Sequence, residues 1–171
     1  ETQLRCTSPP AKVAAASAAA IFDFSAPSEE LHLFGRPTDA AGLLMGVLRL
    51  TGPEFKRVGT AVFEVPDLST LDSFVVEFDL FMGGGLGGEG VSVNVGDMPD
   101  TYFDERGAGT ALSLVLATYA PRIQVWYMGA LLAQVTEELP SGNATLFVPV
   151  RVALSDDRRL SLVYGGGTVL Q

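Results

Sequence analysis

Apolar residues recur along this chain in short runs that glycine, proline, aspartate and serine interrupt roughly every eight to twelve residues. Apolar residues at helical spacing are almost absent, so the pattern predicts a sandwich or barrel of many strands. The predicted strands lie near Leu31–Phe34, Val47–Thr51, Thr60–Val65, Phe74–Met82, Val91–Val95, Ala111–Thr118, Ile123–Tyr127, Leu131–Thr136, Leu146–Leu154 and Leu160–Tyr164. We therefore expect an all-β fold.

The segment 74–81 shows the alternation most clearly, because successive side chains of a strand point to opposite faces. Glu77 and Asp79 share one face, which we expect to be solvated. The opposite, packed face takes Phe74, Val76, Phe78 and Leu80. One packed and one solvated face is typical of antiparallel sheets, so we expect a sandwich of two such sheets.

The segment 146–154 alternates in the same way but contains a proline. The residues expected to point inward are Leu146, Val148, Val150, Val152 and Leu154. Pro149 has no backbone N–H, so it demands a sheet edge, a bulge or a missing bond in the strand ladder.

Two glycine clusters, at 83–90 and 165–167, predict loops. The first lacks the Lys-Ser/Thr pair of a P-loop, and a strand-like segment rather than a helix follows it, so neither nucleotide-binding motif fits. A returning strand has barely begun after the second cluster, and we expect the sequence to be a piece of a longer chain. Residues 1–20 then form an alanine-rich lead-in, and residues 21–171 form one domain.

The charge balance narrows the choice of partners. The 171 residues include 20 acidic and 11 basic ones, which give a formal net charge of −9. A field of this sign repels nucleic acid and anionic membranes, and no stretch reaches the ~20 apolar residues of a membrane helix. Neither nucleic acid nor membrane insertion is expected. Cys6 is the only cysteine, so it is either half of an intermodule disulfide or a free thiol.

Several glycine-punctuated segments follow one another in a distinctive order over nearly the whole chain. They are Phe22–Ser25 leading into Leu31–Gly35, then Gly59–Phe63, Phe74–Phe81, Gly88–Val93, Gly107–Leu114, Ala117–Tyr119 and Ile123–Gly129. This order resembles the concanavalin A-like lectin and glucanase superfamily, which includes L-type lectins and laminin-G-like modules. The resemblance implies a jelly roll of two antiparallel sheets, in which many members hold glycans on the concave face or its loop rim.

The resemblance also implies a sugar-binding carboxylate at Glu89. Sugar-binding relatives carry a Gly-x-Asp-Gly-like motif after the glycine loop, and Gly88-Glu89-Gly90 stands at that place here. A glutamate carboxylate accepts hydrogen bonds from hydroxyl groups as aspartate does. The alternative is that Glu89 is a solvated turn residue.

The residues favour no metal cofactor. Metal-binding relatives have a Phe-Asp-Thr-Tyr-like segment where this chain has Leu116–Tyr119, so Ala117 replaces the acidic calcium ligand. A calcium ion would have to use other oxygens in the polar loop Gly96–Gly109, where carboxylates lack the spacing of an EF-hand. Those oxygens belong to Asp97, Asp100, Asp104 and Glu105.

Glycan binding needs no metal, because aromatic faces stack on the C–H surfaces of sugars. Trp126 and Tyr127 are neighbours on one strand, so one must face inward, and we expect a core role for one of them. The aromatic candidates are Tyr102, Tyr119, Trp126 and Tyr127. The expected ligand-binding residues are Glu89, Asp97, Asp100, Tyr102 and Tyr119.

Catalysis is not expected. Related glucanases carry Glu-x-Asp-x-Glu on one strand, whereas this chain has Glu77-Phe78-Asp79-Leu80-Phe81, which lacks the final carboxyl group. His32 is the only histidine, which excludes a multi-histidine zinc site, and no Gly-x-Ser-x-Gly elbow is present. We expect His32 to pack at a strand position.

These features predict a non-catalytic module for recognition or adhesion, extracellular or at the cell surface, with a glycan or glycoprotein as its first-choice ligand. Asn143-Ala144-Thr145 is an acceptor for N-glycosylation, which favours secretion. The alternative is a structural module of a large extracellular assembly that has lost its sugar site and contacts other protein modules. A glycoside hydrolase is disfavoured by Phe81.

Overall fold

The computed structural model is built of strands. It describes residues 2–5, 22, 24–38, 41–52, 54, 56–64, 73–83, 90–103, 112–118, 120–136 and 146–171. These residues contain no helix, and so no helix long and apolar enough to cross a membrane. The prediction of an all-β fold with antiparallel sheets is confirmed.

The larger sheet has seven strands in the order β13-β12-β11-β6-β1-β4-β3. Their bounds are β1 (Thr2–Arg5), β3 (Gly42–Leu44), β4 (Val47–Thr51), β6 (Phe74–Met82), β11 (Val148–Leu154), β12 (Leu160–Tyr164) and β13 (Gly167–Leu170). All neighbours pair antiparallel. At its centre, β11 pairs with β6 from Val148 opposite Leu80 to Leu154 opposite Phe74.

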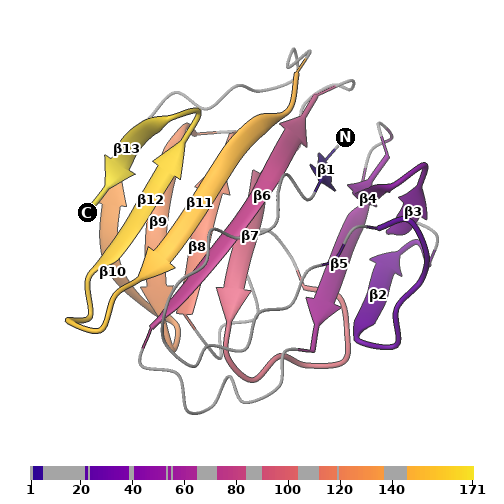
Figure 1. The fold of residues 1–171 in the computed structure, drawn as a ribbon, viewed down its shortest axis with the longest axis horizontal. Coiled ribbons are helices and arrows are strands. Elements are labelled where there is room, and N and C mark those ends of the chain that lie inside the picture. Colours follow the sequence, from indigo (N-terminus) through magenta and orange to yellow (C-terminus); the bar gives the residue numbers. More distant parts are fainter. Residues whose placement is uncertain are drawn as a thin grey trace.

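The smaller sheet is a meander of four strands in the order β10-β9-β8-β7. Its strands are β7 (Gly90–Val95), β8 (Leu112–Ala117), β9 (Arg122–Tyr127) and β10 (Ala130–Val135). In Figure 1 this sheet lies behind the β13-β12-β11-β6 part of the larger sheet. A separate antiparallel pair consists of β2 (Leu31–Arg36) and β5 (Val58–Phe63), beside β4 and β3.

One hydrophobic core joins the two main sheets. The larger sheet contributes Leu80, Val150 and Leu162, and the smaller sheet contributes Leu116 and Ile123, none of them more than 2% exposed. Full burial of such a side chain stabilises the fold by roughly 1.5–3 kcal/mol. The molecule is therefore a β-sandwich-like assembly in which one face of each main sheet packs against the shared core.

The two-stranded sheet joins this core through a close backbone approach. A Cβ atom on Gly59 of β5 would lie 1.6 Å from the carbonyl oxygen of Leu50 in β4, so only glycine fits there. On the same pair, the ring of Phe63 packs against those of Phe22 and Phe24, with centroids 4.7 and 6.1 Å apart. Phe24 is itself a buried core residue.

Each strand predicted from the sequence overlaps a strand of the structure, and Phe74–Met82 and Leu160–Tyr164 match residue for residue. The pattern does not predict β1 or β3, which have only four and three residues. The returning strand expected after the second glycine cluster is present as β13. Of the predicted lead-in 1–20, only Thr2–Arg5 is described, and it forms β1 between β6 and β4. This segment gains its strand from neighbours that are distant in sequence.

Two details of the predicted faces are wrong. Asp79 is only 4% exposed instead of solvated, because it lies in mid-sheet between Pro149 of β11 and Arg5 of β1. Leu146 is 75% exposed because β11 begins only at Val148. Pro149 lies on an interior strand opposite Asp79, and the β11–β6 register has no bulge there, so of the three predicted options only the missing ladder bond at its nitrogen is left. Its carbonyl accepts a hydrogen bond from Gly165 N–H at 3.0 Å.

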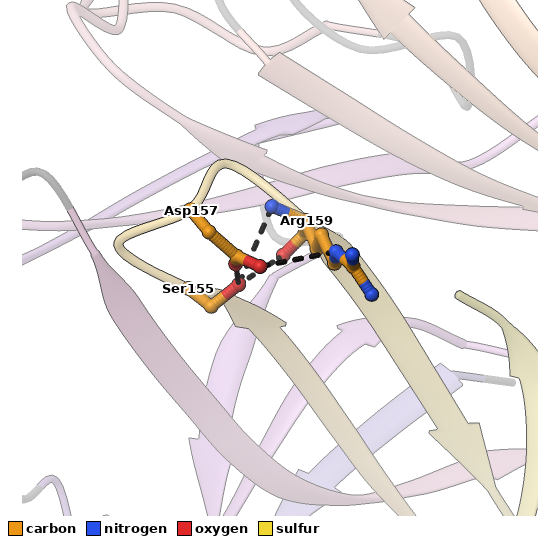
Figure 2. Close-up of polar contacts among 3 residues, drawn as sticks. All are labelled: Ser155, Asp157 and Arg159. Carbon is orange, nitrogen blue, oxygen red and sulfur yellow. Dashed lines mark hydrogen bonds and ion pairs between the residues drawn. The ribbon is translucent and has the colours of Figure 1, made fainter.

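The turn between β11 and β12 is held by a polar cluster (Figure 2). The Ser155 hydroxyl contacts the Asp157 carboxylate, and Arg159 Nε lies 3.0 Å from Asp157 Oδ2. Ser155 N–H donates to the Arg159 carbonyl at 3.0 Å, which closes the hairpin. Arg158 has a φ of 63°, so the cluster offsets the cost of a left-handed residue in this exposed turn.

Candidate functional site

The face of the smaller sheet that points away from the core carries mostly polar side chains. Because the core takes Val91, Leu114, Leu116, Ile123 and Val125, the alternate residues of the same strands lie on the opposite face. We call this the outer face; its residues are Gly90, Ser92 and Asn94 of β7, Ser113, Val115 and Ala117 of β8, Arg122, Gln124 and Trp126 of β9, and Leu131 and Gln134 of β10.

The strand register arranges these residues in rows across the sheet. One row runs Leu131, Trp126, Ser113, Asn94, and the next runs Gln134, Gln124, Val115, Ser92. The third row runs Arg122, Ala117, Gly90. The β8 members of these rows are covered, with Ser113 1%, Val115 2% and Ala117 7% exposed. The accessible part of the outer face therefore lies on the flanking strands β9, β10 and β7, whose outer-face residues are partly or fully exposed.

Hydrogen bonds connect the polar side chains within and between rows. The Ser113 hydroxyl donates to Asn94 Oδ1 at 2.5 Å, and Asn94 Nδ2 donates to the Ser92 hydroxyl at 2.9 Å. On the other side of β8, Gln124 Nε2 donates to Gln134 Oε1 at 2.7 Å. The bonds orient amide and hydroxyl groups that can both donate to and accept from a ligand.

Two N–H donors on this face have no acceptor within the described part of the chain. Trp126 Nε1 and Arg122 Nε are shielded from solvent and make no hydrogen bond, although both side chains are partly exposed. A buried donor without a partner costs about 1–3 kcal/mol. Because both atoms are covered, a ligand acceptor can reach them only when the side chains around them move.

The expectation that Trp126 or Tyr127 has a core role is wrong for both. Trp126 lies on the outer face and is partly exposed. Tyr127 lies on the core side of β9 but is 54% exposed, because it is the last residue of the strand and the core does not extend to it. Tryptophan on the outer face supplies an aromatic surface beside the polar groups.

Three of the predicted ligand-binding residues lie together in the segment that follows β7. Asp97, Asp100 and Tyr102 are all exposed, Tyr102 by 39%. The segment is anchored at its end, where Thr60 Oγ1 of β5 accepts a hydrogen bond from Phe103 N–H at 3.2 Å. The other two, Glu89 and Tyr119, lie outside the described residues, as do Cys6, Asp104, Glu105 and Asn143.

The register separates the predicted residues into two groups. Gly90, which follows Glu89, pairs with Ala117, while Val95, just before the 96–103 segment, pairs with Leu112. The five residue steps from Gly90 to Val95 span roughly 17 Å, so the segments entering and leaving β7 are at opposite ends of the sheet. The outer face lies between these ends.

On the outer face of the larger sheet, side chains of β6 contact side chains in or next to β11. Glu77 Oε1 accepts from Arg151 Nε at 3.0 Å, and the ring of Phe81 packs on that of Phe147 with centroids 5.6 Å apart. The two acidic positions that match the glucanase motif are thus an ion-paired Glu77 and a buried Asp79.

The described residues contain no group of three or more histidine, cysteine, aspartate or glutamate side chains placed to hold a metal ion. His32 stands on β2, as expected of a strand position, and its Nε2 lies 3.1 Å from Glu64 Oε1 without the alignment of a hydrogen bond. The His32 side chain is 41% exposed, so this pair lies at the surface.

The sequence interpretation missed the amide and hydroxyl groups of the outer face. The signal is present in the strands: Ser92 and Asn94 alternate with valines in Val91–Val95, and Gln124 and Trp126 alternate with Ile123 and Val125. What cannot be obtained from one strand is the register that places the polar positions of neighbouring strands side by side.

No protein-family model, no curated protein and no solved structure matches this chain.

Proposed function

We propose that this chain is a non-catalytic recognition module, secreted or displayed at a cell surface, that binds glycans on the outer face of its smaller sheet. The observation that carries the proposal is the combination on one face of Trp126, a hydrogen-bonded set of neutral amide and hydroxyl groups, and two N–H donors without acceptors. Sugars present hydroxyl groups that donate and accept, and C–H faces that stack on aromatic rings.

The proposal includes a concanavalin A-like jelly roll. Two features support it: the main sheets are antiparallel and share a core, and the chain passes from β6 to the smaller sheet at β7 and returns from β10 to pair β11 with β6. Gly90, which follows Glu89 in the sequence, and the segment that begins at Gly96 then lie at the two ends of the outer face. We propose that residues at both ends contribute to the binding of a ligand that extends along the outer face.

The absence of catalysis is likewise a proposal. A retaining glycosidase needs two free carboxyl groups roughly 5–5.5 Å apart. In β6, Glu77 is paired with Arg151, Asp79 is buried, and Phe81 packs on Phe147 where a third carboxyl group would stand. These contacts favour a structural role for the strand.

A second candidate function is a structural module that contacts other proteins. One observation favours it: the edge strand β10 and its hairpin expose the large apolar side chains of Tyr127, Met128, Leu131 and Leu132. Edge strands without charge pair readily with other chains. In this alternative the outer face has no ligand, and binding depends on β10.

The test is a glycan array probed with the purified chain, once with calcium and once with a chelator. We expect binding that the chelator does not change. Gln124→Ala should weaken binding, and Trp126→Ala should weaken it by at least about tenfold, as expected for a central aromatic contact. Arg151→Ala, on the other sheet, is the matched control and should bind as the unaltered chain does.

The same array separates the alternatives. If Glu89→Ala abolishes binding while Gln124→Ala and Trp126→Ala do not, the site is at the loop and not on the sheet. Sensitivity to the chelator would contradict the absence of a metal. No binding by folded protein to any glycan would overturn the proposal and favour the structural module.

A further inference from the structure

We infer that the ligand of the outer face is an acidic glycan, with a carboxylate that Arg122 binds. This inference rests on the proposed function and adds the charge of the ligand and the residue that selects it. The chain has a net charge of −9, yet the one charged residue among the described residues of the outer face is the cation Arg122.

Arg122 has no anionic partner in the described part of the chain. No ion pair or hydrogen bond of its side chain is formed there, and its Nε is shielded from solvent. Other arginines of the molecule do pair, as Arg57 with Glu54, Arg151 with Glu77 and Arg159 with Asp157. A ligand carboxylate would supply the charge-assisted hydrogen bonds that this partly buried guanidinium lacks.

The residues paired with Arg122 across the sheet offer it no side-chain acceptor. In its row the adjacent residues are Ala117 and Gly90, whose side chains have no polar atom. Gly90 has a φ of 145°, and a Cβ atom there would lie 2.3 Å from the Leu116 carbonyl oxygen, so a longer residue does not fit. The row therefore ends in a cation beside small residues.

The distance between Arg122 and Trp126 indicates the length and the chemistry of the acidic ligand. They are on the same face of β9, four residues and roughly 13 Å apart, with Gln124 between them. A ligand that reaches both is longer than one sugar ring, carries hydroxyl groups for the amides and has its carboxylate at the Arg122 end. An acidic oligosaccharide has this chemistry, whereas an acidic peptide lacks the hydroxyl-rich rings.

The test compares oligogalacturonate with its fully methyl-esterified form, because the two have the same backbone and differ in charge. We expect the acid to bind about tenfold more tightly than the ester, as a charge-assisted hydrogen bond is stronger than a neutral one. Raising the salt concentration should weaken binding of the acid and leave the ester unchanged. Arg122→Gln should bring the acid to the affinity of the ester, and Arg122→Lys should keep part of the difference.

Arg49→Gln is the matched control, because Arg49 Nε is also buried without a partner but lies on the larger sheet. It should keep the preference for the acid. Equal binding of acid and ester, or a preference that survives Arg122→Gln in folded protein, would overturn the inference while the proposed function stands. Equal binding of poly-L-glutamate would also overturn it, since charge alone would then suffice. If neither form of galacturonate and no neutral glycan binds, the proposed function itself is contradicted.

Discussion

The two main sheets of this molecule turn chemically different faces away from their common core. On the larger sheet, the outward residues of β6 satisfy one another: Glu77 pairs with Arg151, and Phe81 packs on Phe147. On the smaller sheet, Trp126 and Arg122 keep donors without acceptors beside a set of neutral polar groups. The larger sheet also keeps one such donor, Arg49 Nε of β4, so the contrast lies in the linked neutral amide and hydroxyl groups and the indole that the smaller sheet gathers on its outward face.

The strongest test of this comparison is to show that the smaller sheet depends on its packed face. Leu116→Ala should lower the free energy of unfolding by about 2–5 kcal/mol, because the side chain is fully buried and leaves a cavity. Leu131→Ala, on the outer face and 46% exposed, should change it by no more than about 0.5 kcal/mol. Urea unfolding measures both, and similar losses would contradict the assignment of the faces.

The polar groups of the outer face should matter more for stability where they are buried. Ser113 is 1% exposed and donates to Asn94 Oδ1, so Ser113→Ala leaves that oxygen unpaired and should cost about 1–3 kcal/mol. Gln124→Ala breaks an exposed bond and should cost less. A larger loss for Gln124→Ala in the same unfolding experiment would show that the Ser113–Asn94 pair is not the anchor of the face.

Two hairpins, one on each sheet, have the same strained turn. Met45 and Met128 have φ values of 51° and 48°, are 96% and 64% exposed, and each precedes a glycine of positive φ. Asparagine adopts this conformation more easily, so Met45→Asn and Met128→Asn should each stabilise the chain by about 0.5–1 kcal/mol. Thermal unfolding measures the gain; a loss at Met128 alone would indicate a contact made by that side chain.

The ion pair of the larger sheet should contribute little. Glu77 and Arg151 are about half exposed, with 49% and 45% of their side-chain surface accessible, so Glu77→Gln should lower stability by at most about 1 kcal/mol. The effect should shrink at high salt. Binding of any glycan should stay unchanged, and a lost ligand would mean that this face, and not the smaller sheet, holds the site.

The smallest effect concerns the core side of β12 and appears only in alkali. Burial raises the pKa of Tyr164 above its usual 10.0. Below pH 10 the phenol is protonated in both the folded and the unfolded chain, so stability is unaffected. As the pH rises further the unfolded chain loses its proton first, and the free energy of unfolding falls until the folded pKa is passed. Tyr164→Phe should reduce the fall between about pH 8 and about pH 11 in urea unfolding; an unchanged fall would contradict this.

The sequence predicts the strands well where the alternation of apolar residues is long. Phe74–Met82 is found to the residue, whereas β1 escapes notice because Thr2–Arg5 has one apolar residue and takes its strand from pairing with β6 and β4. Asp79 shows the limit of the two-face rule: alternation assigns it to the outward face, yet it is only 4% exposed there, in the middle of the sheet.

For the candidate site, residues near one another in sequence were easier to predict than residues brought together by pairing. Asp97, Asp100 and Tyr102 share one loop in the sequence and in the structure. Arg122, Gln124 and Trp126 also lie close in sequence. Their proposed role in binding depends on the residues beside them on β8 and β7, which are Ala117, Gly90 and Ser113. That proximity is a property of the register and not of any single segment.

Local alternation and residue type are enough to assign this protein to the all-β class, to locate most of its strands and to show that β6 lacks the third carboxyl group of a glucanase. The partners of the outward polar groups, such as Asn94 for Ser113 and Arg151 for Glu77, follow only from the folded structure. The reason is physical: a hydrogen bond or an ion pair depends on what lies a few ångströms away across the sheet, and strand pairing sets that distance.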